Sequence, residues 1–281
     1  MFKKLVAAAF VFGAGVAHAF IPQAGTWVVT SEVNGKPGRG FGIDVQNGTL
    51  VMQMYAYENT GKSTFYLAVG NVVDNQVTAD LKSYEGGRFL GSEDRSGTEK
   101  GNAGAVKIRF VDGVSGFITF PGESEKAISR FNFGYAAVPQ SLKGSWLFTT
   151  YSPTLGWGVE TPTFTAVGNA TSTGSGTISA PSSNLMCEHQ VSGGLAGFVF
   201  CVKFFSNSST TQHTYLFKYS VNEGEGDWYP NNGKTGYGFY VKRLVTDDGQ
   251  VAGLIRKDEE AFVAPEQAQA FAAELAAAAH R

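Results

Sequence analysis

The chain has 281 residues, of which 43% are hydrophobic and 16% charged, so it is a folding sequence rather than a disordered one. With 22 basic and 24 acidic residues, it lacks the excess positive charge that nucleic-acid binding requires. Its 36 glycines punctuate short segments rich in Phe, Tyr, Val and Thr, a pattern typical of an all-β protein.

Residues 1–19, MFKKLVAAAFVFGAGVAHA, are predicted to be a signal peptide. Lys3 and Lys4 form the charged start, Leu5–Val16 is apolar, and Ala17–Ala19 is a small-x-small cleavage site. The apolar stretch is too short for a stable membrane anchor, and no second one of spanning length follows. We therefore expect an exported protein, periplasmic or extracellular, without a membrane span. Its mature chain would keep 20 basic and 24 acidic residues, a net charge of −4.

Residues 20–140 are predicted to form a first β-barrel-like domain, an antiparallel meander of about eight strands. Apolar and basic residues alternate in the segment VKIRFV that begins at Val106, as expected for strands with one buried face. Asn47-Gly48 and Asp112-Gly113 predict tight hairpin turns. Eight such strands can close into a barrel, with a twisted sandwich as the alternative. The predicted strands are Gly25–Thr30, Gly40–Gln46, Leu50–Tyr57, Ser63–Val69, Val77–Tyr84, Ala105–Val111, Gly116–Phe120 and Ala127–Phe133.

Residues 141–256 are predicted to form a second β-barrel-like domain of about seven strands. A Ser/Thr/Gly-rich passage, Asn169–Asn184, reads as a surface loop or short edge strands. The predicted strands are Ser145–Tyr151, Gly158–Thr165, Gly176–Ala180, Asn184–Gln190, Phe198–Phe205, His213–Ser220 and Tyr237–Val245. Residues 257–281 differ in kind: they are rich in alanine, and Pro265 suits a first helical turn. We expect a C-terminal helix there, either packed on a barrel mouth or free.

The two cysteines, Cys187 and Cys201, are predicted to form a disulfide in the second domain. A turn at Ser192–Gly194 would place their strands side by side, and export favours oxidation. The alternative is a metal site made by both thiols and His189.

One frame recurs three times along the chain: Gly-x-Trp, then Gly-x-Gly followed by Phe or Val. Its copies are GTWVVTSEVNGKPGRGF from Gly25, GSWLFTTYSPTLGWGV from Gly144 and GDWYPNNGKTGYGF from Gly226. We interpret them as equivalent strand pairs in which glycine permits close backbone approach. The third copy is predicted to supply the closing strands of the second barrel, with a degenerate third repeat as the alternative.

The stretch Gly38–Gly70, GRGFGIDVQNGTLVMQMYAYENTGKSTFYLAVG, resembles a group of secreted bacterial Gly-x-Trp…Gly-x-Gly β-repeat proteins. The resemblance covers about 110 residues well and implies a fold and an exported location, but no reaction. The early Trp after Gly also resembles the start of calycin barrels such as lipocalins and avidins. That resemblance implies structural pairs of a plugging Trp and a covering Arg: Trp27 with Arg130, and Trp146 with Arg243.

Signatures of catalysis are scarce, so no catalytic residue, metal ligand or cofactor is predicted. His189, His213 and His280 lack metal-binding spacing, and neither a Gly-x-Ser-x-Gly elbow nor a phosphate loop occurs. The acidic stretch Glu223–Asp227 reads as a solvated turn, with Ca²⁺ binding as the alternative.

Rows of aromatic residues provide the candidate ligand site. They form the core or, if a barrel interior is not filled, line a pocket for an apolar or aromatic ligand. These residues are Tyr55, Tyr57, Tyr66, Phe198, Phe200, Tyr215, Phe217 and Tyr219. Trp157 and Tyr237, in the Gly-x-Gly turns, offer an alternative platform for sugars or a partner protein.

The sequence therefore predicts a non-enzymatic exported protein that binds a small molecule or an envelope or extracellular protein. One alternative is an exported hydrolase that uses an Asp/Glu pair, whose separation no sequence spacing here fixes. Another is a structural or adhesion module of the cell envelope.

Overall fold

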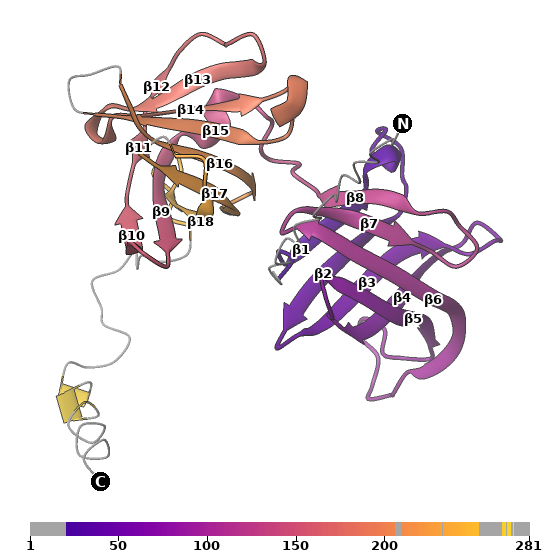
Figure 1. Ribbon diagram of the computed structural model, residues 1–281. Coiled ribbons are helices and arrows are strands. Elements are labelled where there is room, and N and C mark those ends of the chain that lie inside the picture. Colours follow the sequence, from indigo (N-terminus) through magenta and orange to yellow (C-terminus); the bar gives the residue numbers. More distant parts are fainter. Residues whose placement is uncertain are drawn as a thin grey trace, which may run out of the picture.

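The computed structural model describes residues 21–205, 210–231 and 233–252, and residues 266, 267, 269, 270 and 272 near the C-terminus. The described chain is all-β, as predicted, and forms two units joined by the segment between β8 and β9 (Figure 1). The predicted signal peptide lies outside the described residues. So does most of the predicted tail helix, which stays a prediction. No helix within the described ranges has the length and apolar character needed to cross a membrane.

The first unit is a closed barrel of eight antiparallel strands in sequential order, in which β8 pairs with β1 (Figure 1). The predicted eight-strand meander is therefore confirmed, and it closes as a barrel rather than a sandwich. A single 3₁₀ turn, η1 (Thr30–Glu32), follows the first strand. The strands are β1 (Gly25–Val29), β2 (Gly40–Gln46), β3 (Thr49–Tyr57), β4 (Ser63–Asn71), β5 (Gln76–Glu85), β6 (Thr98–Asp112), β7 (Ser115–Thr119) and β8 (Lys126–Arg130).

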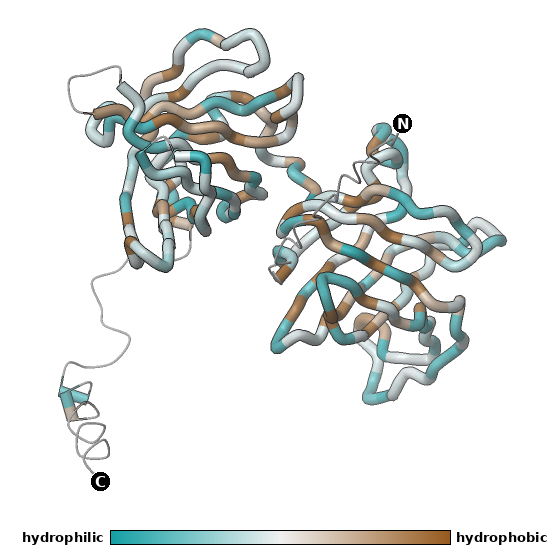
Figure 2. Tube along the Cα trace, viewed as in Figure 1, coloured by the Kyte–Doolittle hydropathy of each residue, from teal (hydrophilic) through white to brown (hydrophobic). Residues whose placement is uncertain are grey.

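Apolar side chains from all eight strands fill the interior of this first barrel. The alternation that the sequence predicts in β6 is present: Val106, Ile108 and Phe110 are buried, and the residues between them face outward. Figure 2 shows hydrophobic and hydrophilic residues mixed along the strands in this way. The innermost large side chains are Trp27, Phe41, Leu50, Met52, Ile118 and Ile128. The first barrel thus has a packed core.

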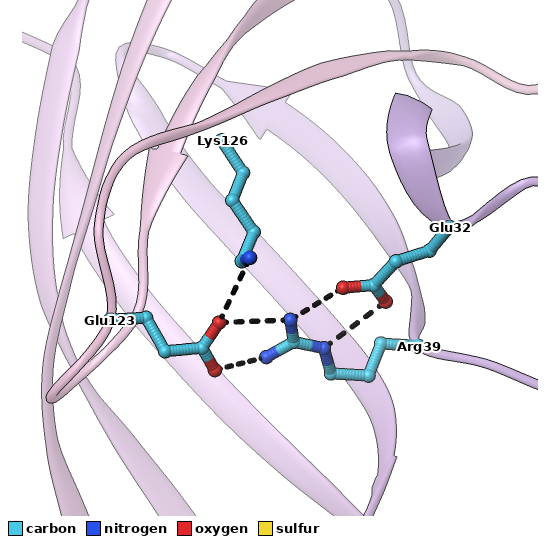
Figure 3. Close-up of polar contacts among 4 residues, drawn as sticks. All are labelled: Glu32, Arg39, Glu123 and Lys126. Atoms are coloured by element: carbon cyan, nitrogen blue, oxygen red, sulfur yellow. Dashed lines mark hydrogen bonds and ion pairs between the residues drawn. The ribbon is translucent and has the colours of Figure 1, made fainter.

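Arg39, the central residue of the first Gly-x-Gly, joins two loops of the first barrel (Figure 3). Its guanidinium donates to both oxygens of Glu32, at 2.6 and 3.2 Å, and to both oxygens of Glu123, at 2.5 and 3.0 Å. It also lies over the ring of Phe120, 4.4 Å from the centroid. Lys126 adds an ion pair to Glu123 at 3.5 Å. This cluster ties the segment after β1 to the turn between β7 and β8.

The Arg39 cluster predicts that the first barrel loses stability in acid. Hydrogen bonds from Arg39 hold the pKa values of Glu32 and Glu123 below the ordinary 4.5. A carboxylate with a depressed folded-state pKa contributes stability above its unfolded pKa, and this is lost as the pH falls through the folded value. We expect the denaturation midpoint to change little with pH near neutrality and to decrease as the pH falls below about 4.5. This decrease should be smaller in Glu32→Gln. The exposed control Glu93→Gln should keep the steep fall of the wild type. If the midpoint of Glu32→Gln fell as steeply as that of this control, the prediction would be contradicted.

The second unit is a ten-stranded antiparallel arrangement that does not close into a barrel, and we call it the half-barrel. Its strand order is β10-β9-β18-β17-β16-β15-β14-β13-β12, with β11 beside β9. The second unit, predicted to be β-barrel-like with about seven strands, is therefore an open half-barrel of ten strands. The strands are β9 (Gly144–Ser152), β10 (Gly156–Glu160), β11 (Thr163–Phe164), β12 (Ala166–Val167), β13 (Gly174–Ala180), β14 (Leu185–Gln190), β15 (Val199–Phe204), β16 (Thr211–Ser220), β17 (Glu223–Pro230) and β18 (Tyr237–Val245). Three 3₁₀ turns accompany them: η2 (Pro139–Leu142), η3 (Pro181–Ser183) and η4 (Gly193–Leu195).

The half-barrel stays open because one chain segment changes its partner. Residues 156–164 run beside β9 as β10 and β11, and residues 166–167 then leave it to pair with β13 as β12. The wall is continuous where this change occurs, since the amide of Trp146 donates to Pro162 and that of Thr165 to Ser179. Further along, β10 has a paired strand on one side only.

Trp146 forms the centre of the half-barrel core at its continuous end. The guanidinium of Arg243 lies 4.2 Å from the Trp146 ring, so the structure contains the contact that the calycin resemblance implies. Tyr219 packs edge-on against the same indole at 5.4 Å. The predicted disulfide is present as well: Cys187 and Cys201 lie directly opposite each other on β14 and β15. The metal alternative that used both thiols and His189 is therefore wrong.

The first two copies of the Gly-x-Trp frame have the same local structure. The indole nitrogen of Trp27 donates to the carbonyl of Gln23 at 3.0 Å, and that of Trp146 donates to Leu142 at 2.8 Å, each four residues earlier. The preceding glycines both have positive φ, 126° and 104°, which suits glycine alone. The third copy differs: it supplies β17 and β18, which lie between β16 and β9 inside the open strand order.

Arg130 lies differently from Arg243. It is opposite Trp27 in the strand register, but its guanidinium lies against Gly25 and donates to the carbonyl of Thr26. A Cβ atom at Gly25 would be 2.7 Å from the guanidinium nitrogens, so the glycine makes room for this arginine. In the first barrel the arginine therefore binds the backbone beside the tryptophan.

The two units touch through polar contacts. Lys218 on β16 pairs with Asp112 of the first barrel at 2.7 Å, and Ser220 donates to Asn132 at 2.6 Å. Glu225 accepts a hydrogen bond from the amide of Gly113, and burial raises the pKa of this carboxyl group. Part of the acidic stretch Glu223–Asp227, for which Ca²⁺ binding is the alternative interpretation, thus faces the first barrel.

Candidate functional site

The open side of the half-barrel contains a cavity of about 220 Å³, which we call the notch. It lies between β9 and β10 on one side and β16 and β17 on the other. The residues that line it include Phe148, Thr150, Gly158, Glu160, Tyr215 and Trp228. Gly158 leaves room here, because a Cβ atom on it would lie 2.6 Å from the hydroxyl of Thr150. The notch lies beside β10, which pairs with β9 on one edge and has no paired strand among the described residues on its other edge.

Aromatic rings from three different strands form the inner wall of the notch. Phe148 and Tyr215 are buried and meet edge to face, with centroids 5.6 Å apart. Trp228 closes the wall, and its indole nitrogen is buried without a hydrogen-bond partner among the described residues. Edge-to-face rings of this kind offer both π faces and ring edges to a further aromatic group.

A polar group forms the rim of the notch. Glu160 pairs with Lys203 at 2.5 Å and accepts a hydrogen bond from the hydroxyl of Tyr215 at 3.2 Å. Burial is the main cause that raises the pKa of Tyr215, so the phenol stays protonated and remains a donor. The Glu160–Lys203 pair spans from β10 to β15, across the open side. The rim therefore balances its charges while the wall behind it is aromatic.

His213 lies at the same rim, opposite Lys203 in the strand register. Its ring packs edge-on against Trp228 at 5.6 Å, and its Nδ1 accepts from the amide of Asn231 at 3.3 Å. Burial and then the nearby Lys203 lower the pKa of His213, and Glu160 opposes them weakly. The imidazole is therefore neutral at neutral pH and adds a polar but uncharged group to the rim.

The predicted aromatic residues of the first barrel do not line its interior, although Tyr55 borders a surface hollow formed by β1, β2 and β3. Tyr55 and Tyr57 point outward, with 65% and 49% of each side chain exposed. Tyr66 is half-buried and packs against the filled core. The alternation of β3 explains this result, because Met52, Met54 and Ala56 occupy its inward positions and the tyrosines its outward positions.

The predicted aromatic residues of the second unit separate onto two faces. Val199 and Cys201 of β15 lie opposite Phe217 and Tyr215 of β16 and face the core with them. Phe200 is opposite Leu216, on the outer face, where Phe198 packs under Lys218. Phe217 and Tyr219 point inward but lie toward Trp146. Of the eight predicted ligand-binding residues, only Tyr215 lines the notch.

The two residues of the predicted alternative platform, Trp157 and Tyr237, also lie apart in the structure. Trp157 is 74% exposed on the outer face, and its ring lies 4.7 Å from that of Tyr151. Tyr237 points inward and contacts Trp228 at 6.2 Å. The two residues therefore lie on opposite faces of the sheet.

His189 lies on β14, buried in the half-barrel. Its Nε2 is 3.0 Å from the hydroxyl of Tyr219, and burial lowers the pKa of the imidazole to about 4. The residues that the structure describes contain no group of three or more His, Cys, Asp or Glu side chains arranged to hold a metal ion.

Sequence reasoning missed Glu160, Lys203 and Trp228 as residues of one site. They lie on three strands whose proximity depends on the bend after β10 and on the register of β15 and β16. A usable signal was present only for Trp228, as the tryptophan of the third repeated frame.

Comparison with known proteins does not assign a function to the notch. No family model, curated protein or solved structure matches the chain. The function proposed below therefore depends on the predicted export signal and on the residues of the notch.

Proposed function

We propose that the chain is an exported, non-enzymatic binding protein whose half-barrel takes an aromatic or apolar group into the notch. The observation that carries the proposal is the open side itself, where Phe148, Tyr215 and Trp228 surround about 220 Å³. Ligand sites in proteins are concave and combine apolar walls with a few polar groups, and the notch combines an aromatic wall with the polar rim of Glu160 and Lys203. A cavity of roughly 150 Å³ can hold benzene, so the notch has room for a substituted ring.

The charges at the rim indicate which kind of ligand the notch accepts. Glu160 and Lys203 neutralise each other, so neither attracts a strongly charged ligand. A ring with one neutral polar substituent suits this arrangement, because the ring contacts the aromatic wall and the substituent reaches the rim. Indole and p-cresol have this character, and cyclohexanol provides a comparison without a π face.

Export is supported by two independent features. The first is the predicted signal peptide of residues 1–19, and the second is the disulfide between Cys187 and Cys201. Disulfides form and persist mainly in oxidising compartments such as the periplasm or the extracellular space. A ligand or partner would therefore be met outside the cytoplasm.

A matched pair of substitutions on β9 tests the notch. Thr150 is buried and lines the cavity, whereas the neighbouring Thr149 faces outward. Thr150→Phe should fill the notch and weaken p-cresol binding by roughly tenfold or more, since its ring would occupy the site. Thr149→Phe should change the affinity by no more than about twofold. Ligand-detected NMR and titration calorimetry measure both effects.

Two outcomes would contradict the proposal. The first is that neither indole nor p-cresol binds the wild-type protein. The second is that Thr150→Phe binds them as tightly as Thr149→Phe does. If p-cresol binds and Thr150→Phe weakens its binding, native mass spectrometry identifies the natural ligand. It is applied to protein purified from the periplasm, before and after denaturation.

A further inference from the structure

The strand β10 is an edge strand that borders the notch. It pairs with β9 over five consecutive positions, from Gly156 opposite Ser152 to Glu160 opposite Phe148, and it stands at the end of the strand order. Its other side faces the opening that leads to the aromatic wall. An edge of this kind presents backbone donors and acceptors to any chain that can lie beside it.

This edge lacks several of the features with which proteins usually block strand addition, and its one charged residue, Glu160, is already paired with Lys203. Such features are proline, lysine, β-bulges and covering segments. The sequence of β10, GWGVE, contains neither proline nor lysine, and its register with β9 shows no shift. Trp157 and Val159 are 74% and 65% exposed on its outer face, so apolar surface accompanies the open backbone.

We infer that the occupant of the notch is an extended peptide that adds to β10 as a further strand and places one aromatic or large apolar side chain in the cavity. This inference rests on the proposed function and names the partner of the same site. Successive side chains of a strand point to opposite faces. A strand beside β10 therefore directs one residue toward Phe148, Tyr215 and Trp228, and the residues before and after it toward the outer face beside Trp157 and Val159.

A second copy of the chain fits this site poorly. If two β10 strands paired edge to edge, the inward positions of the incoming strand would be Gly156, Gly158 and Glu160, since these face inward in β10 itself. Two glycines and a carboxylate would leave the aromatic wall without an apolar partner. A peptide with an aromatic residue at an inward position supplies that partner and hydrogen-bonds to the same edge.

Peptide selection tests the inference on the full-length mature protein. A random peptide library displayed on phage is selected on the wild-type protein and counter-selected on Thr150→Phe. The expected peptides contain a shared aromatic residue and bind Thr149→Phe as they bind the wild type. Their binding should slow hydrogen exchange at the amides of Gly156–Glu160.

N-methylation of single amides in a selected peptide gives the decisive readout. Strand addition uses every second amide, so methyl groups at alternate positions should weaken binding about fivefold each, as expected for one hydrogen bond, and those between should not. A uniform response, slowed exchange outside β10, or no enrichment over Thr150→Phe would overturn the inference. So would a wild-type protein that is dimeric through β10. If p-cresol binds and no peptide does, the inference fails and the proposed function stands; if neither binds, both fail.

Discussion

Replacement of Trp146 by alanine is expected to lower the free energy of unfolding of the half-barrel by about 3–5 kcal/mol while the first barrel keeps its stability. The indole is almost fully buried and packs edge-on against Tyr219. Its face is covered by Arg243, which is itself buried. Truncation would leave a cavity and would remove the aromatic face that the buried guanidinium contacts. Hydrogen exchange during denaturant titration, followed by mass spectrometry of peptides from each unit, measures the two stabilities separately.

Trp27→Ala is the matched control in the first barrel. Trp27 is equally buried and makes the same indole-to-backbone bond, but Arg130 lies against the neighbouring Gly25. We expect its loss to destabilise the first barrel alone, and Trp146→Phe to give an intermediate effect on the half-barrel. Equal destabilisation of both units by either substitution would show that they unfold as one body.

The first barrel could be predicted from the sequence because its strands follow the simplest pattern. Inward apolar residues alternate with polar ones in segments such as that of Val106, and turns such as Asn47-Gly48 separate the strands. Each strand pairs with its neighbours in the chain, so the order of the predicted strands is also their order in space. Eight twisted strands are enough to close a barrel, but the alternation does not distinguish a barrel from a sandwich, and the pairing of β8 with β1 decides between them.

The half-barrel departs from the prediction where pairing partners change along one segment. The sequence predicts one strand over Gly158–Thr165, whereas the structure has β10, β11 and β12 with two different partners. Alternation of residue types defines two faces of a strand but does not name its neighbour. The open side, and with it the notch, therefore could not be predicted.

Alternation also leaves undecided which of two apolar faces points inward. In β15 the aromatic set with Phe200 and the smaller set with Val199 and Cys201 are both apolar. The larger rings were expected inside, but the register with β16 places the smaller residues there. The inner space is already occupied by Tyr215 and Phe217 of β16.

Gly226, the first glycine of the third frame, makes room for Phe217 in this inner space. A Cβ atom at Gly226 would lie 2.0 Å from the carbonyl oxygen of Leu216 and 2.6 Å from the Cα of Phe217. Glycine therefore permits β17 to lie close to β16 at the position opposite Phe217. The sequence shows this glycine in the Gly-x-Trp of the third frame, but the close approach that requires it depends on tertiary packing.

Removal of the disulfide is expected to destabilise the half-barrel by roughly 3 kcal/mol, since the bond closes a loop with a sequence separation of 14. Both cysteines are buried and pair directly across β14 and β15. Lys203 lies two residues beyond Cys201 on β15 and forms the rim of the notch, so a looser β15 should also weaken p-cresol binding. The double variant Cys187→Ala/Cys201→Ala is compared with the wild type by hydrogen exchange in denaturant, with and without reductant.

In this comparison the first barrel, which has no cysteine, serves as the internal reference. Reductant should bring the wild-type half-barrel close to the stability of the double variant and leave the variant itself unchanged. If the double variant were as stable as the oxidised wild type, β14 and β15 would be held by their strand pairing and core contacts alone. A drop in the first barrel of the same size would instead show that the contacts of Lys218 and Glu225 couple the two units during unfolding.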